Sequence, residues 1–169
     1  MKKLILAILA LILALGAVGC AKKQNEGTAA DGAASNTGFA VVVSGTTVRL
    51  GEDAAPVLTA LGTPKVSQEV FDCGAGNSRM FYRFASIDLY TMKTDGAEVI
   101  DQIELNDDLA STDKNICIGN TVEALKAAYG EPQRSDGDDL VYVSGSCELI
   151  VEIDDGRVDD IELIRRTNG

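Results

Sequence analysis

The sequence predicts an α+β protein of two tandem modules, each a helix followed by an antiparallel meander, with the helices on one face and an open sheet face on the other. The main observation is a repeat. Residues 51–64 (GEDAAPVLTALGTP) recur without a gap at 119–132 (GNTVEALKAAYGEP), at a constant offset of 68 (119 − 51). Short β-branched and aromatic runs follow both copies, with hairpin signals at Asp95-Gly96 and Asp155-Gly156.

The N-terminus has the form of a secretion signal. Two lysines follow Met1, residues 4–15 are apolar, and small residues precede Cys20. The stretch Ala17-Val18-Gly19-Cys20 resembles a bacterial lipobox, in which the cysteine becomes the lipidated first residue of the mature chain. We therefore expect a lipid anchor on Cys20, made by acyl chains and not by a spanning helix. The alternative is a soluble secreted protein whose signal peptide is cleaved at another position, with Cys20 incidental.

A flexible tether is expected after the anchor, because residues 20–38 are rich in Ala, Gly, Ser, Thr and Asn and have no apolar period. The predicted organisation is a signal peptide (1–19), a lipidated Cys20 with its tether (20–38), a first module (39–106) and a second module (107–169). The predicted location is the extracytoplasmic face of a bacterial cell membrane.

The first module begins with two extended runs, 39–43 and 46–50. Asp53 can cap a helix that ends at Gly62, and Pro64 stops it. Extended runs at 66–71, 79–84, 87–92 and 99–105 predict a meander. The polar stretch 106–115 is expected to be a linker to the second module.

The second module repeats this plan with eight fewer residues after its helix. Thr121 is the expected N-cap. The expected strands are 140–143, 147–153 and 158–164.

Residues alternate between apolar and mixed character along 147–154, so one face of the sheet should cover the helices and the other should be open to water. Tyr, Met and Ile side chains among carboxylates are suited to binding a protein. The alternative is that they are ordinary scattered surface residues. The residues expected on the open face are Tyr90, Met92, Glu104, Glu148, Ile150, Glu152, Glu162 and Ile164.

Composition excludes several classes of function. The net charge of −11 opposes binding to nucleic acid, whose phosphates would be repelled. The chain has no His, which rules out imidazole zinc sites and His-based acid–base catalysis. No enzyme activity, cofactor or metal is expected. We interpret the acidic clusters as solvent-exposed turns. A weak calcium site in the loop 136–139 is the less favoured interpretation.

Three cysteines remain after Cys20, and outside the cell a disulfide is permitted. Cys117 and Cys147 both fall in the second module, and a bond between them is one possibility. A bond from Cys73 to either of them and three free thiols are the others.

A family resemblance follows from these residues. Residues 51–67, with VLTALGTPKVS at their end, resemble the helix of the SmpA/OmlA outer-membrane assembly lipoprotein domain. The tandem arrangement is similar to the β-lactamase inhibitory protein fold, which duplicates that module. The resemblance implies protein binding but carries over no contact residue of the inhibitor.

The sequence thus predicts a membrane-anchored lipoprotein that acts as a non-catalytic protein-binding module, inhibitor-like or envelope-assembly-like. Its expected partners are the membrane, through Cys20, and an extracytoplasmic protein. The alternative is a surface sensor lipoprotein that binds a small ligand or a metal.

Overall fold

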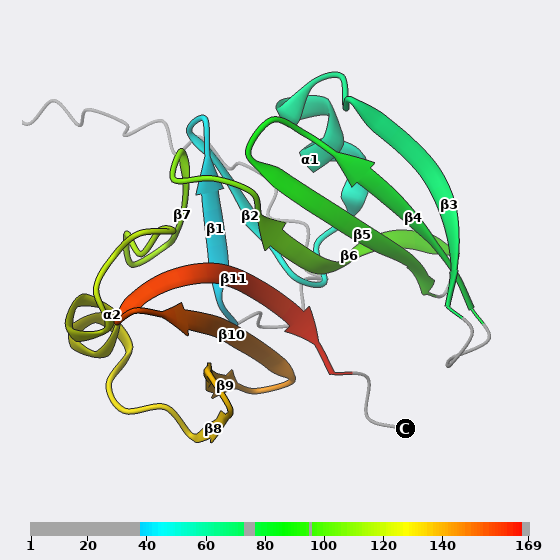
Figure 1. Cartoon of the computed structure of the whole chain (residues 1–169). Helices are drawn as coiled ribbons and strands as arrows, with labels where there is room; N and C mark the ends of the chain where they lie inside the picture. Colours follow the sequence, from blue (N-terminus) through cyan, green and yellow to red (C-terminus); the bar gives the residue numbers. More distant parts are fainter. Residues whose placement is uncertain (1–37, 73–76, 95, 167–169) are drawn as a thin grey trace, which may run out of the picture. The chain divides into compact units, whose positions relative to one another are not determined.

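Most of the described chain is β-structure, arranged as two antiparallel sheets with two short helices (Figure 1). The computed structural model describes residues 38–72, 77–94 and 96–166, which belong to one compact unit. The predicted signal peptide, Cys20 and all but the end of the tether lie outside these residues, as does Cys73. The large sheet has eight strands, in the order β3 (Val66–Asp72), β4 (Asn77–Arg83), β5 (Ile87–Thr94), β6 (Ala97–Leu105), β11 (Arg157–Arg165), β10 (Cys147–Asp154), β9 (Asp139–Ser144) and β8 (Arg134–Asp136).

The small sheet has three strands, in the order β2 (Thr46–Arg49), β1 (Ala40–Val43) and β7 (Ala110–Thr112). β1 and β2 form a hairpin through Ser44 and Gly45, which have φ angles of 50° and 80°. Two positive φ angles suit a tight turn whose twist matches that of the strands. β7 lies in the segment that the sequence predicts to be a linker, and it pairs with β1 because its buried Ala110 and Thr112 face the core.

The two helices are α1 (Ala54–Leu61) and α2 (Val122–Tyr129). Asp53 accepts a hydrogen bond from the Ala55 amide at 3.0 Å, and Thr121 accepts one from the Ala124 amide at 3.2 Å. Both helices end at a glycine with positive φ, Gly62 at 84° and Gly130 at 81°. The predicted caps and stops are therefore present, and the glycines serve to end helices.

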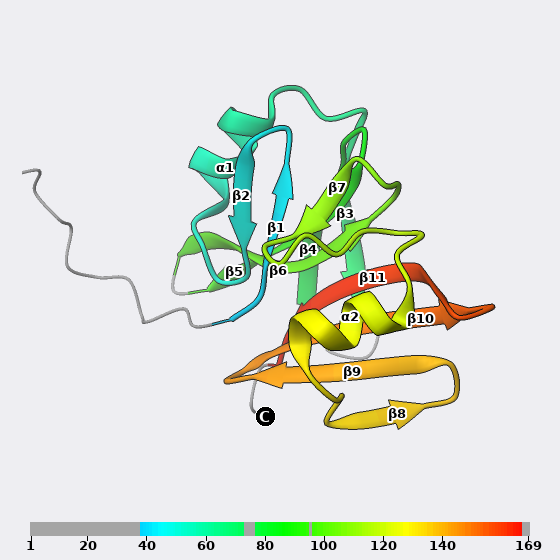
Figure 2. The same cartoon turned by 90° about the vertical axis from the view of Figure 1, so that its left-hand side faces the viewer.

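The hydrophobic core lies on one face of the large sheet. The helices and the small sheet contribute Ala54, Val57, Leu125, Val41, Val43, Val48 and Leu50 to it. The large sheet contributes alternate residues of its central strands, among them Leu89, Ile103, Leu163, Leu149 and Tyr142. These five are successive cross-strand partners, so they form a single row on the face that the helices cover. In Figure 2, α2 lies in front of β10 and β11, and α1 lies beside β2 of the small sheet.

Equivalent glycines join each helix to the last strand of its meander. The Gly51 amide donates to the Ile100 carbonyl at 2.7 Å, and the Gly119 amide donates to the Val158 carbonyl at 2.8 Å. The φ angles of the two glycines are 81° and 89°. The repeat in sequence therefore corresponds to a repeated backbone connection.

The predicted α+β fold of two tandem helix-plus-meander modules is wrong. The protein is mostly β, with two antiparallel sheets and only two helices in the described chain. An eight-residue helix is about 12 Å long, whereas a strand of eight or nine residues extends for about 27 to 30 Å. Two such helices are too short to cover the large sheet, and the small sheet supplies much of the remaining apolar cover. No described helix is long and apolar enough to cross a membrane.

Candidate functional site

The candidate site is the face of the large sheet that points away from the helices, which we call the open face. Strand register defines it, because cross-strand partners share a face. One row of partners crosses it from β3 to β9: Gln68, Phe81, Tyr90, Gln102, Ile164, Glu148 and Val143. The neighbouring row runs from β3 to β8: Val66, Arg83, Asp88, Glu104, Glu162, Ile150, Val141 and Arg134.

The structure brings all eight predicted surface residues onto this face, on four adjacent strands. They are Tyr90 and Met92 on β5, Glu104 on β6, Glu162 and Ile164 on β11, and Glu148, Ile150 and Glu152 on β10. Most of them are half-buried, Glu152 is exposed and Glu148 is buried. Their placement on one face leaves their role in binding a prediction.

Two carboxylates face each other at the centre of the open face. Glu104 and Glu162 are cross-strand partners where β6 meets β11. The Gln102 amide nitrogen donates to both, at 2.7 Å to Glu104 and 2.6 Å to Glu162. Burial, with the charges of Glu104 and Asp160, raises the pKa of Glu162 to about 7. Burial also raises the pKa of Glu104, so this pair retains a proton more readily than isolated carboxyls do.

Aromatic and arginine side chains stack beside the carboxylate pair. The rings of Phe81 and Tyr90 lie 5.0 Å apart. The Arg79 guanidinium lies 4.9 Å from the centre of the Tyr90 ring, and that of Arg83 lies 5.2 Å from the Phe81 ring. Such cation–π contacts hold planar groups in fixed positions. This end of the face is therefore a pre-formed, partly apolar platform.

Asp101 and Gln102 connect the platform to the centre of the sheet. The register between β5 and β6 shifts after Tyr90, and Asp101 is the extra residue of the resulting bulge. Arg79 forms an ion pair with Asp101 at 3.2 Å and donates to Oε1 of the Gln102 side chain at 2.8 Å. Arg165 also contacts Asp101, at 3.3 Å.

Two acidic side chains in the open-face rows are buried and fully paired. Asp88 accepts from the Arg83 Nε at 3.0 Å and from the Asn106 amide at 2.8 Å. Glu148 is 1% exposed and accepts from Arg134 at 2.6 and 3.1 Å and from Arg166 at 2.9 Å. The hydrogen bonds from Arg134 lower the pKa of Glu148. Glu148 is thus covered, and the two arginines are the charged groups that this region exposes.

The far end of the open face is acidic. Glu152 has Asp160 and Asp139 as its cross-strand partners on either side. Burial and the neighbouring carboxylates raise the pKa of Glu152 and of Asp160. Like charges directly opposite each other destabilise a sheet, so this end favours a cationic partner.

Sequence reasoning missed the residues that build the platform: Arg79, Phe81, Arg83, Asp88 and Gln102. A signal for two of them was present. Tyr82 aligns with Tyr142 in the second copy and belongs to the core-facing set, so its neighbours Phe81 and Arg83 point the other way. Nothing local indicates that Gln102 bridges two strands, because its partner Glu162 is 60 residues away.

The bond between Cys117 and Cys147 was one of three possibilities, and in the structure both residues are free thiols. Cys147 is buried at the start of β10, and burial raises the pKa of its thiol. A buried thiol with a raised pKa is poorly nucleophilic.

The loop suggested as a weak calcium site is a tight hairpin between β8 and β9, in which Asp136 pairs with Asp139 and Gly137 has a φ of 64°. Among the described residues, no group of three or more His, Cys, Asp or Glu side chains is arranged to hold a metal ion.

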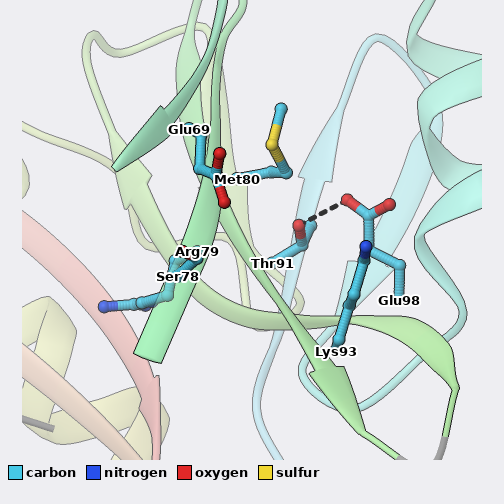
Figure 3. A pocket seen from close by; sticks show the side chains of 7 residues that line it. All are labelled: Glu69, Ser78, Arg79, Met80, Thr91, Lys93 and Glu98. Atoms are coloured by element: carbon cyan, nitrogen blue, oxygen red, sulfur yellow. Dashed lines mark hydrogen bonds between the residues drawn. The ribbon is translucent and has the colours of Figure 1, made fainter. Parts of the chain in front are cut away.

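A cavity of about 250 Å³ lies beside β3, β4 and β5 (Figure 3). Glu69, Met80 and Thr91 are cross-strand partners on the helix side of the sheet and line it together with Lys93 and Glu98. Glu98 accepts hydroxyl hydrogen bonds from Thr91 at 2.6 Å and from Tyr82 at 2.9 Å. Burial, and then the bond to Glu98, raises the pKa of Tyr82 to about 12.

A scan against models of known protein families, a search of curated proteins and a search of solved structures each found no match. Inference about function therefore depends on the sequence and on the geometry of the open face.

Proposed function

We propose that this protein is a lipid-anchored lipoprotein on the extracytoplasmic face of a bacterial membrane, and that it binds a protein partner through the open face without catalysing a reaction. The lipobox-like residues before Cys20 and the polar tether support the anchor. The anchor and tether would hold the folded unit near the membrane and leave it free to meet a partner.

The observation that carries the binding proposal is the composition of the open face. It combines a platform of Phe81, Tyr90 and two arginines with an acidic centre and an acidic end. Aromatic and arginine side chains are the commonest anchors of protein interfaces. A face of mixed charge selects among partners by electrostatic complementarity.

Site-specific crosslinking in the native membrane tests this proposal. A photoreactive amino acid replaces Tyr90 on the open face in one variant, and Ala127, which is exposed on α2, in the control. We expect a discrete protein adduct from position 90 and none from position 127. Equal adducts at both positions, or none from position 90, would contradict binding through the open face.

The resemblance to the SmpA/OmlA domain and to the β-lactamase inhibitory protein favours two finer forms of this function, envelope assembly and enzyme inhibition. The identity of the crosslinked partner distinguishes them. An exported hydrolase that loses activity on binding supports inhibition, and an integral envelope protein supports assembly.

A small-ligand sensor is the second candidate, and the cavity beside β3 to β5 is the observation in its favour. Its volume is below the 300 to 1,000 Å³ or so that is typical of ligand sites. Calorimetry with calcium and with cell-wall fragments tests this candidate. Saturable heat that is lost in the Glu98→Gln variant would support it.

A further inference from the structure

The outer side of β3 is one of the two edges of the large sheet. β3 is the first strand in the sheet order, so β4 pairs with only one of its two edges. Its seven residues follow β4 in continuous register without a bulge. The backbone N–H and C=O groups along its outer edge are available to another strand.

Natural sheets protect such edges with proline, lysine, bulges or very short strands. The opposite edge of this sheet follows that rule, because β8 has only three residues and carries Arg134 and Asp136. β3 is longer and has no proline, lysine or bulge, and Glu69 is the one charged residue between Val66 and Phe71. The two edges therefore differ in whether they admit a further strand.

Exposed apolar side chains distinguish β3 as well. Phe71 is 65% exposed and Val66 is 36% exposed, and both belong to the few large apolar residues that the described chain leaves in water. Ser67, Glu69 and Phe71 share the helix side of the sheet, while Val66 and Val70 are on the open-face side. A strand added next to β3 would cover apolar surface on both of its faces.

We infer that the outer edge of β3 binds an extended segment of another protein by strand addition, with a lysine or arginine of that segment opposite Glu69. The negative charge of Glu69 is the reason for expecting a basic segment. Glu69 is exposed at the centre of β3, so a basic side chain opposite it on the helix side of the added strand would face its carboxylate. Glu98 lines the same cavity but is the cross-strand partner of Lys93, so the attraction is assigned to Glu69. Valine or threonine on alternate positions would lie beside Val66 and Val70.

A second copy of this chain suits the edge less well. Antiparallel pairing about the centre of β3 would place Glu69 opposite Glu69. Like charges in that position destabilise the pairing, and each chain carries a net charge of −11. This inference concerns a surface other than the open face and does not rest on the function proposed for that face.

Two synthetic peptides test the inference. Each has seven residues that alternate threonine and valine, with lysine at the centre of one peptide and glutamate at the centre of the other. Hydrogen exchange of the β3 amides is measured by NMR on the full chain in detergent. We expect the lysine peptide to slow exchange at every second amide of β3, because alternate N–H groups point outward in a strand.

The Glu69→Lys variant should bind the lysine peptide about fivefold more weakly and should bind the glutamate peptide more tightly than the unmodified chain does. Asp108→Lys is the matched control, since Asp108 is exposed and the substitution changes the net charge equally. That variant should keep the affinity of the unmodified chain within about twofold.

Three results would overturn the inference. They are unchanged exchange of the outward-pointing β3 amides with the lysine peptide, an equal loss of affinity in Glu69→Lys and Asp108→Lys, and slow exchange of these same outward-pointing amides before any peptide is added. The last result would mean that the chain itself, or a second copy, already occupies the edge.

Discussion

The two faces of the large sheet are built from alternate residues of the same strands, yet different interactions stabilise them. On the helix-side face, apolar partners such as Leu89, Ile103 and Leu163 pack into one cluster. On the open face, their neighbours along the chain form ion pairs, amide bridges and ring contacts.

The difference shows how a sheet face can be ordered without a second apolar layer. Each deeply buried acid of the open-face rows has its own arginine, as Asp88 has Arg83 and Glu148 has Arg134. The central carboxylates Glu104 and Glu162 share only one amide donor, and Glu152 faces further carboxylates. Stability is therefore expected to reside in the core face and in the acids that an arginine holds, and the binding proposed above would use the acids that lack an arginine in the described ion pairs.

The largest expected effect separates the two faces at neighbouring positions of β10. Leu149 is 0% exposed and Ile150 is half-buried on the open face. Leu149→Ala should lower the free energy of unfolding by about 2 to 5 kcal/mol, because it leaves a cavity in the core. Ile150→Ala should cost about 1 kcal/mol or less. Chemical denaturation measures both variants, and equal losses would mean that the open face is packed like the core.

The next effect concerns the paired acid of the open face. Glu148→Gln removes a charge that two arginines hold, and we expect a loss of about 1 to 3 kcal/mol at neutral pH. The lowered pKa of Glu148 stabilises the fold above the ordinary value of 4.5, and this contribution is lost as the pH falls through the folded-state pKa. The deficit of the variant should therefore disappear in acid.

Glu152→Gln is the control on the same strand and face. The substitution removes a carboxylate that the neighbouring carboxylates repel, so the free energy of unfolding should stay unchanged or rise. A loss as large as that of Glu148→Gln would refute the distinction between paired and unpaired acids.

The smallest effect is a pH dependence at the centre of the open face. The pKa of Glu162 is about 7 in the folded state, above its ordinary value of 4.5. The folded protein thus keeps a proton that the unfolded chain releases, and the resulting stability is fully present below pH 4.5 and is lost as the pH rises through 7.

Glu162→Gln should remove this dependence and raise the stability at pH 8 by about 1 kcal/mol, after allowance for solvent screening. Urea denaturation at pH 4, 6 and 8 measures it, with the exposed Asp108→Asn as control. A variant that keeps the pH slope of the unmodified chain would show that Glu162 does not titrate near pH 7.

The sequence predicted the features that depend on near neighbours. Asp53 and Thr121 were expected as caps, and each accepts from an amide two or three residues away. The eight residues expected on the open face do share one face, because side chains alternate along a strand wherever the strand pairs. β7 was missed because three residues, Ala110–Thr112, carry too little pattern to distinguish a strand from a polar linker.

The sequence by itself determined where the helices begin and end and which residues share a face, since these follow from hydrogen bonds and periods within a few residues. Only the tertiary structure decided that β6 pairs with β11, which makes Glu104 and Glu162 neighbours, and that β3 is left at an edge. It also decided that two short helices need a separate small sheet to complete the core. These outcomes depend on contacts between residues about 60 positions apart, where competing pairings differ in total burial and charge and not in local pattern.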